Sequence, residues 1–456
     1  MTNKGLSKLG FYALDRLTDS FPKSFPKVFQ KAFLLIAGNE LVYRFYQKRY
    51  SRKLKRIEFF GKILIITDVN IGDAIMMQQS INVIKSYYPN AQVDYLCNQS
   101  GGDLLLGLRE VNHVFNVFGG NGYPTKNELA VLREIVKANK YSVIMNFCPF
   151  ISIQDLQNDV PVLQLYVPYA SYIIRLWRTK KGQMHFSAAV HSFFEELARS
   201  AFHHPENQDS DQVSQSHPIS VFRGNTIYLT NNAIRAARDF LARNNLSRID
   251  HLLFFNPNAF SRYNQIPAKV QIQILRSILA SNDVKTVLLG AGYPSGGIEQ
   301  TILASLPPEY QKKLIIVPHL PLGAFAALID ACDVFLSSDT GPVHIAASWK
   351  ISLSPNDLLR NRTTVVTVFG ASDSRMYGYD SHRPDHIPAN QQAPSKVFIA
   401  DTPRRNITCI NKMGKTCREV RCFDGLNLRE ISGYVISCLR NPRNQGMLKM
   451  DKAVIE

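Results

Sequence analysis

Residues 333–347, DVFLSSDTGPVHIAA, combine a strand, a short polar loop and a helix within fifteen positions. The apolar residues of 333–338 are typical of a buried strand, and Pro342 suits the first turn of a helix. A strand that leads directly into a helix is the repeating unit of parallel α/β sheets. This stretch therefore predicts an α/β fold, with a polar loop at the carboxyl end of a strand.

The same alternation continues on both sides of this stretch. Strands are predicted at 62–69, 92–98, 114–118 and 141–147, and again at 251–257, 285–291, 314–319, 333–338 and 363–370. Helices are predicted at 73–88 and 126–140, and then at 267–281, 296–305, 322–332 and 343–349. Two α/β series predict two Rossmann-like domains with parallel sheets facing a central cleft.

The domain boundaries follow from these series and from composition. We predict a basic helical extension at 1–58, one α/β domain at 59–220, a second at 221–425, and a helix and tail at 426–456. Residues 203–217 are polar and without an apolar period, so they are predicted to form a loop or linker.

The overall composition is that of a soluble globular protein, with 45% apolar and 20% charged residues. It excludes a disordered, fibrous or coiled-coil chain. Seven cysteines in 456 residues are too few and too odd in number for a secreted disulfide framework, so a cytoplasmic location is expected. The N-terminus lacks the apolar core of a signal peptide, and no apolar run is long enough to span a membrane.

The net charge of +17 calls for an anionic partner, and it is concentrated at one end. Residues 1–56 hold 13 Lys and Arg against 3 acidic residues, with Phe25, Phe29 and Phe33 four positions apart. This pattern is typical of a helix on an anionic membrane surface, and equally of a packed helix with a solvated basic face. No nucleic-acid-binding motif accompanies the charge, so no nucleic-acid partner is predicted.

The loop 337–344 is the first candidate for chemistry. A helix N-terminus attracts phosphate, Gly341 allows close approach of the backbone, and the Thr340 hydroxyl adds a donor. The alternative is that Asp339 or Thr340 only caps the helix. His344 could equally be a core histidine whose ring nitrogens are hydrogen-bonded within the protein.

Two further loops follow strands. The loop 256–262 contains Asn258, Ser261 and Arg262. The side chains of Ser261 and Arg262 could hold a diphosphate. Asp73 follows the first strand, where a carboxylate could act as a general base, or simply as a helix cap.

Three other signals are weak. The glycines of 290–296 do not have the spacing of a dinucleotide-binding fingerprint, and the acidic pair in 209–211 lies in the polar linker. Cys409, Cys417 and Cys422 lack the spacing of a zinc site and are expected to be structural or free thiols.

Taken together, the loops resemble glycosyltransferase family 9, the bacterial heptosyltransferases of lipopolysaccharide core assembly. The resemblance covers residues 60–440 and rests on Gly72-Asp73 followed by Tyr88-Pro89, on Asn256-Pro257-Asn258 through Ile266-Pro267, on Asp339-Thr340-Gly341-Pro342-Val343-His344, and on Phe369-Gly370-Ala371-Ser372-Asp373. In the loop 256–267, Asn264 stands where the family has a lysine. If the resemblance holds, Arg262 would have to supply the positive charge of that lysine.

The resemblance implies a GT-B fold, with an acceptor-binding domain at 59–220 and a nucleotide-sugar-binding domain at 221–425. It implies an inverting, metal-independent transfer without a cofactor, with ADP-heptose as the expected donor and a lipid-linked glycan as acceptor. Asp73 would deprotonate the acceptor, and the donor would be bound by Asn258, Ser261, Arg262, Asp339, Thr340, Gly341 and His344. The C-terminal helix would cross back to the N-terminal domain, and the basic N-terminus would hold the enzyme on the inner face of the cytoplasmic membrane.

Two alternatives come from other classes of protein. One is a non-catalytic, membrane-associated binding protein with a degenerate GT-B fold. The other is a dinucleotide-dependent oxidoreductase, which would need a nicotinamide pocket that the loop 290–296 does not indicate.

Overall fold

A computed structural model describes residues 61–67, 70–119, 124–148, 151, 156, 160–165, 184–202, 224–246, 251–259, 263–291, 297–354, 359–370, 372–381, 394–400 and 421–440. The basic extension, the polar segment 203–217, Cys409 and Cys417 lie outside the described residues. Contacts within the chain divide it into two compact units, Met1–Phe222 and Arg223–Glu456.

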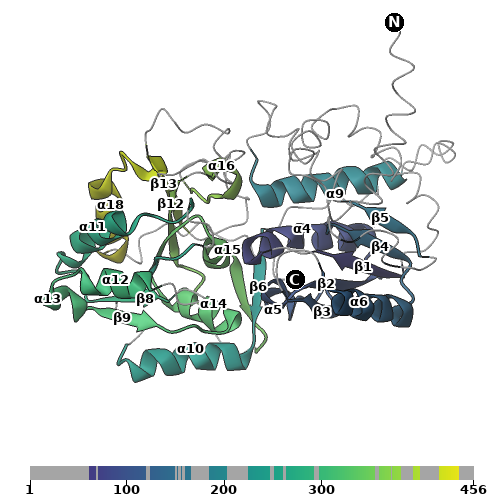
Figure 1. Cartoon of the computed structure of the whole chain (residues 1–456), viewed down its shortest axis with the longest axis horizontal. Coiled ribbons are helices and arrows are strands. Elements are labelled where there is room, and N and C mark those ends of the chain that lie inside the picture. The colour runs from purple at the N-terminus through teal and green to yellow at the C-terminus, as the bar shows by residue number, and fades with distance from the viewer. Residues whose placement is uncertain are drawn as a thin grey trace, which may run out of the picture. The chain divides into compact units, whose positions relative to one another are not determined.

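Unit 1 is built around a five-stranded parallel sheet in the order β3-β2-β1-β4-β5. Its elements are β1 (Lys62–Ile66), α4 (Ile71–Tyr87), β2 (Gln92–Asn98), α5 (Gln99–Leu105), β3 (His113–Phe118), α6 (Lys126–Asn139), β4 (Val143–Asn146), β5 (Val162–Gln164) and α9 (Phe186–Phe202). Figure 1 shows α4 and α9 on one side of this sheet and α6 on the other.

The alternation of side chains along β1 explains why both faces of this sheet are covered. Leu64 and Ile66 pack with α6, and Ile63 and Ile65, which point to the other face, are also fully buried. Helix α6 begins with a capping box, in which the Thr125 hydroxyl accepts from the Glu128 backbone N–H and the Glu128 carboxylate accepts from the Thr125 backbone N–H.

Unit 2 contains a six-stranded parallel sheet in the order β13-β12-β10-β7-β8-β9 and a two-stranded parallel sheet of β11 and β6. Its strands are β6 (Thr226–Leu229), β7 (Leu252–Asn256), β8 (Thr286–Gly290), β9 (Leu314–Val317), β10 (Val334–Ser338), β11 (Trp349–Ser352), β12 (Thr364–Phe369) and β13 (Ser395–Ile399). Its helices are α10 (Asn231–Arg243), α11 (Ala268–Leu279), α12 (Ile298–Ala304), α13 (Pro308–Gln311), α14 (Leu322–Ala331), α15 (Gly341–Ala347), α16 (Ser374–Tyr377) and α18 (Leu428–Arg440), with a 3-10 turn at Arg421–Phe423.

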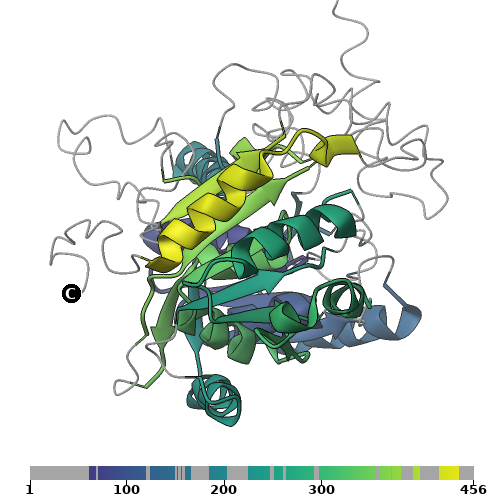
Figure 2. The same cartoon turned by 90° about the vertical axis from the view of Figure 1, so that its left-hand side faces the viewer.

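One face of the larger sheet packs against α11, α12 and α18. The aliphatic side chains of β7, β10 and β12 meet those helices in a single core. Figure 2 shows α18, in yellow, beside α11. The predicted return of this helix and tail to the N-terminal domain stays a prediction, because residues 441–456 lie outside the described part of the chain.

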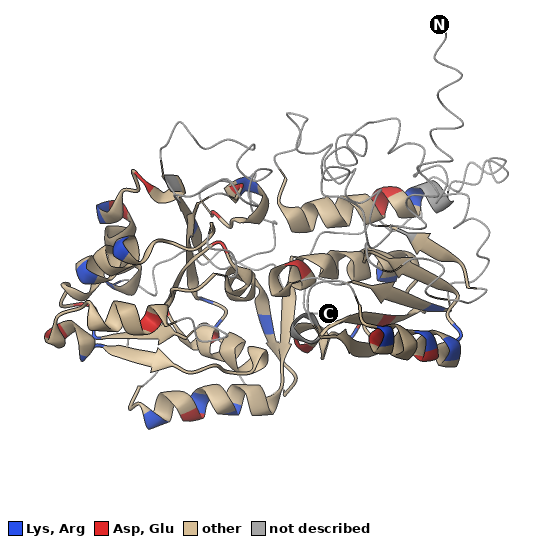
Figure 3. Cartoon of the chain, in the orientation of Figure 1, with Lys and Arg blue, Asp and Glu red and all other residues tan. Residues whose placement is uncertain are grey.

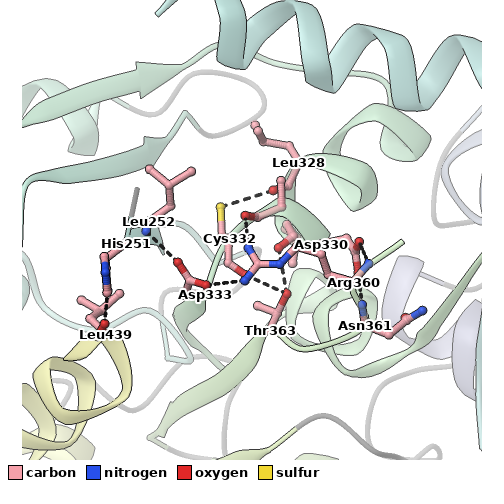
Figure 4. Close-up of polar contacts among 12 residues, drawn as sticks. His251, Leu252, Leu328, Asp330, Cys332, Asp333, Arg360, Asn361, Thr363 and Leu439 are labelled. Carbon is pink, nitrogen blue, oxygen red and sulfur yellow. Dashed lines mark hydrogen bonds and ion pairs between the residues drawn. The ribbon is translucent and has the colours of Figure 1, made fainter. Parts of the chain in front are cut away.

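A buried polar cluster fixes the amino ends of the central strands of unit 2 (Figure 4). The Asp333 carboxylate accepts a hydrogen bond from the Leu252 backbone N–H at 3.0 Å and forms an ion pair with Arg360. The Asp330 carboxylate accepts from the backbone N–H groups of Arg360 and Asn361, at 2.6 and 2.8 Å. The cluster thus holds the amino-end edge of the sheet, opposite the polar loops singled out above.

The predicted helix at 343–349 differs from the observed one. Helix α15 spans Gly341–Ala347, and Trp349–Ser352 is a strand that pairs in parallel with β6. The Ser348 hydroxyl and its backbone N–H both bond back to the His344 carbonyl, which ends the helix.

The charges of the described residues are of mixed sign. Figure 3 shows both signs along α6 and α10, as on ordinary solvated helix faces. Among the described helices none is both long and apolar enough to cross a membrane.

Candidate functional site

The strand order of unit 2 identifies where a ligand should bind. The chain runs from β7 outward to β8 and β9, then returns to place β10, β12 and β13 on the other side of β7. In open α/β sheets, ligands bind beyond the carboxyl ends of the strands at this reversal. In unit 2 the reversal lies between β7 and β10, so the loops after Asn256 and Ser338 form the candidate edge.

A network of amide side chains organises this edge. The Asn256 amide donates to the Ser337 hydroxyl at 3.0 Å and to the Asn258 carbonyl at 3.1 Å. The Asn258 amide donates to the Gly290 carbonyl at 3.1 Å. Asn258, which is predicted to contact the nucleotide sugar, therefore links the ends of β7 and β8.

The loop 339–341 lies at the same edge, between β10 and α15. Thr340 occupies the N-cap position with extended backbone, but its side chain makes no capping hydrogen bond. Asp339 is 8% exposed, and its carboxylate accepts from the Asn264 amide at 3.2 Å. Thr340 therefore does not cap the helix through its side chain, and Asp339 bonds to the side chain of another loop.

His344 lies deeper than its neighbours in the motif. Its side chain is buried, and Nδ1 is 2.8 Å from the Tyr379 hydroxyl. Burial lowers the pKa of His344 to about 4, so the ring is neutral near pH 7. His344 thus has the environment of a core histidine, and its expected contact with a donor stays a prediction.

The remaining predicted donor contacts, Ser261 and Arg262, lie outside the described residues. Of the predicted donor contacts, Asn258, Asp339, Thr340 and Gly341 therefore lie along one sheet edge, and His344 is buried in the helix that follows.

Unit 1 has its own reversal, between β1 and β4, and Asp73 lies next to it. Asp73 is in the first turn of α4, three positions after the N-cap residue Asn70. Burial raises the pKa of Asp73 to about 6, and a hydrogen bond from the Asn70 backbone partly opposes this rise. Asp73 is therefore not the N-cap residue itself, although its carboxylate accepts from the backbone of that residue, and a pKa of about 6 lets it exchange a proton in weakly acidic solution.

The structure adds residues that sequence reasoning missed. Asn264 bonds to both Asp339 and Ser372, the latter at 3.0 Å, although neither is near it in sequence. Glu299, in the first turn of α12 beyond β8, is buried, and its Oε2 has no hydrogen-bond partner among the described residues. Glu299 could have been noticed in the sequence, because it follows the glycine-rich loop at the end of a predicted strand.

A metal site was not predicted, and the described residues contain no group of three or more His, Cys, Asp or Glu side chains placed to hold an ion. Within the same residues, Cys97, Cys148, Cys332, Cys422 and Cys438 form no disulfide bond with one another.

Comparison with known proteins bears on both units. The family model of glycosyltransferase family 9 (heptosyltransferase) matches residues 249–397, which contain the whole candidate edge of unit 2. No curated protein sequence matches the chain significantly.

Two solved structures resemble the chain over both units. A glycosyltransferase family 9 protein from Veillonella parvula aligns with a TM-score of 0.57 and 15% identity, over 84% of this chain and 98% of its own. The ADP-heptose lipopolysaccharide heptosyltransferase II of E. coli aligns with a TM-score of 0.50 and 15% identity, over 83% of this chain and 99% of its own. At these identities the likeness establishes the fold, a GT-B-like pair of α/β units. The resemblance of this chain to glycosyltransferase family 9 is thereby confirmed, by the family pattern in unit 2 and by the fold of both units.

Proposed function

We propose that this protein is an inverting, metal-independent glycosyltransferase that moves a sugar from an ADP-sugar to a lipopolysaccharide or related surface-glycan acceptor. The observation that carries the proposal is Asp73, a shielded carboxylate with a pKa near 6 beside the strand reversal of unit 1. A general base works best when its pKa lies near the working pH.

The proposed chemistry divides between the two units. The Asp73 carboxylate takes the proton of the acceptor hydroxyl, whose oxygen attacks the anomeric carbon of the donor. The bond from that carbon to the diphosphate oxygen breaks, and ADP leaves with the bonding electron pair. Attack opposite to the leaving group inverts the configuration at the anomeric carbon.

The leaving diphosphate is assigned to the edge of unit 2. The Thr340 hydroxyl, which makes no cap bond, and the backbone at Gly341 offer donors where negative charge develops. Arg262 is assigned the fixed positive charge. ADP-heptose is the proposed donor, since the E. coli structure with the same fold is named as an ADP-heptose enzyme. A lipid-linked glycan is the proposed acceptor, which would place the protein at the cytoplasmic face of the membrane.

The test separates donor binding from transfer. Asp73→Asn should bind ADP-heptose as the wild type does, measured by calorimetry, but lose about 10²- to 10⁴-fold in turnover. Wild-type turnover should rise with pH through about 6, with the proton loss of Asp73. Asp103→Asn, at an exposed carboxylate of α5 in the same unit, is the control and should keep full turnover.

Three results would change the proposal. Preference for UDP- or GDP-sugars would keep the fold and discard the heptose assignment. Donor binding that Thr340→Ala leaves intact would remove the assigned diphosphate contact. Binding of no nucleotide sugar, with no turnover, would favour the non-catalytic binding protein.

A further inference from the structure

The ends of three strands in unit 2 are joined through one side chain. Asn264 lies in the loop between β7 and α11, Asp339 follows β10, and Ser372 follows β12. The Asn264 amide nitrogen donates to Asp339 Oδ2 at 3.2 Å, and its amide oxygen accepts from the Ser372 hydroxyl at 3.0 Å. We refer to Asn264, Asp339 and Ser372 as the amide bridge.

The surrounding backbone holds the amide bridge in place. A Cβ atom on Gly370 would come within 2.4 Å of the Phe423 ring and 3.0 Å of the Tyr263 carbonyl, so only glycine lets the end of β12 approach this loop. On the other side, the fully buried Gln271 amide donates to the carbonyls of Pro257 and Ile266, at 3.0 and 2.6 Å. Asn264 therefore stands between two fixed segments of backbone.

The chemistry of the amide bridge is directional. Asn264 donates through a neutral amide, so its hydrogen bond orients the Asp339 carboxylate without cancelling its charge. A carboxylate repels a diphosphate but accepts hydrogen bonds from hydroxyl groups. An oriented Asp339 is accordingly suited to hydroxyl groups beside the diphosphate, and of the groups that carry them the transferred sugar is the one that free ADP lacks.

We propose that Asn264 is a positioning residue, which with Ser372 aims the Asp339 carboxylate at the sugar of the donor and so separates nucleotide sugar from free nucleotide. This inference rests on the proposed function, because it assumes that the edge of unit 2 binds a nucleotide sugar. The proposed role gives Asn264 a function at the position where glycosyltransferase family 9 has a lysine.

The experiment compares ADP with ADP-heptose, by calorimetry, on the full chain. Asn264→Leu and Ser372→Ala should each weaken ADP-heptose binding by about tenfold, the loss expected for one misdirected hydrogen-bond acceptor. Binding of ADP alone should change by less than about twofold, since the assigned diphosphate contacts remain. Ser372→Thr keeps the hydroxyl and should restore ADP-heptose binding. Gln265→Ala is the matched control, because the Gln265 amide faces the Pro257 carbonyl instead of Asp339.

The outcomes distinguish the two levels of the argument. If the wild type binds ADP but does not discriminate ADP-heptose from it, or if Asn264→Leu and Ser372→Ala weaken both ligands equally, the positioning role is wrong while the nucleotide site stands. If the wild type binds neither ligand, the proposed function fails and the role of Asn264 falls with it. Should Asn264→Leu fail to fold, Ser372→Ala decides the question, because it removes only one hydroxyl.

Discussion

At the scale of a single residue, the buried environment that suits Asp73 to catalysis also lowers the free energy of unfolding when its carboxylate is charged. Burial raises its pKa from 3.8 to about 6, so between these values the folded protein holds a proton that the unfolded chain has lost. The free energy of unfolding must therefore fall as the pH rises through this window, and the loss persists above it. The charged carboxylate at neutral pH is thus destabilising.

Asp73→Asn should consequently be more stable than the wild type at about pH 8, by up to roughly 3 kcal/mol for a shift of this size. The gain should shrink as the pH falls from about 6 toward 4 and should vanish below 3.8, where the wild-type carboxyl becomes neutral in both states. Urea unfolding of the two proteins across this range measures it, with Asp239→Asn, at an exposed position of α10, as a control. A less stable Asp73→Asn at neutral pH would contradict the assigned burial of the carboxylate.

Single residues also show how far the sequence could predict the site. Asp73, Asp339, Thr340 and Gly341 were predicted at strand-to-helix loops, because a strand end and a helix start are visible in local sequence. The burial of His344 was not resolved by the sequence, since it depends on Tyr379, 35 positions away. The contact of Asn264 with Ser372 spans 108 positions and has no local signal at all.

At the scale of the element, the central strands and most helices were predicted, whereas the strands β5, β6, β11 and β13 and the helices α9 and α10 were not. The central strands β1, β7 and β10 are buried on both faces and appear in the sequence as apolar runs. The strands β5, β6 and β11 have only three or four residues, and their sequences VLQ, TIYL and WKIS lack the continuous apolar run of the equally short β9, LIIV. Their strand conformation comes from pairing with distant segments, which local sequence does not encode.

The last helix, α18, offers a matched comparison of apolar and ionic contacts. Leu439 is fully buried in the core between α18 and α11, whereas the Arg440 side chain is 58% exposed and pairs with Asp283. Leu439→Ala should lower the free energy of unfolding by about 2–5 kcal/mol, through lost burial and a cavity. Arg440→Ala should cost at most about 1 kcal/mol, since solvent screens the exposed pair.

Urea unfolding of the two variants checks this difference, and salt provides a second control. Only the small effect of Arg440→Ala should diminish at high ionic strength. Equal losses in the two variants would mean that α18 is held by its charges and not by its apolar face.

At the scale of the whole molecule, charge is distributed unevenly along the chain. Residues 1–56 carry a net charge of +10 out of the total of +17. The described helices of the two units instead carry both signs, as along α6 and α10. Attraction to an anionic membrane is therefore expected to depend on the first 56 residues rather than on the two α/β units.

Vesicle flotation of the full chain, and of the chain without residues 1–56, tests this expectation. Each basic residue near an anionic surface contributes about 1 kcal/mol, so the full chain should float with phosphatidylserine vesicles and the shortened chain should not. Raising the salt concentration should weaken the binding, because the charges are then screened. Replacing Phe25, Phe29 and Phe33 by alanine preserves the charge, and a partial loss in that variant would assign the remainder of the binding to the aromatic residues. Equal flotation of the full and shortened chains would contradict a membrane role for residues 1–56. Binding of the lipid-linked acceptor would then depend on the two α/β units alone.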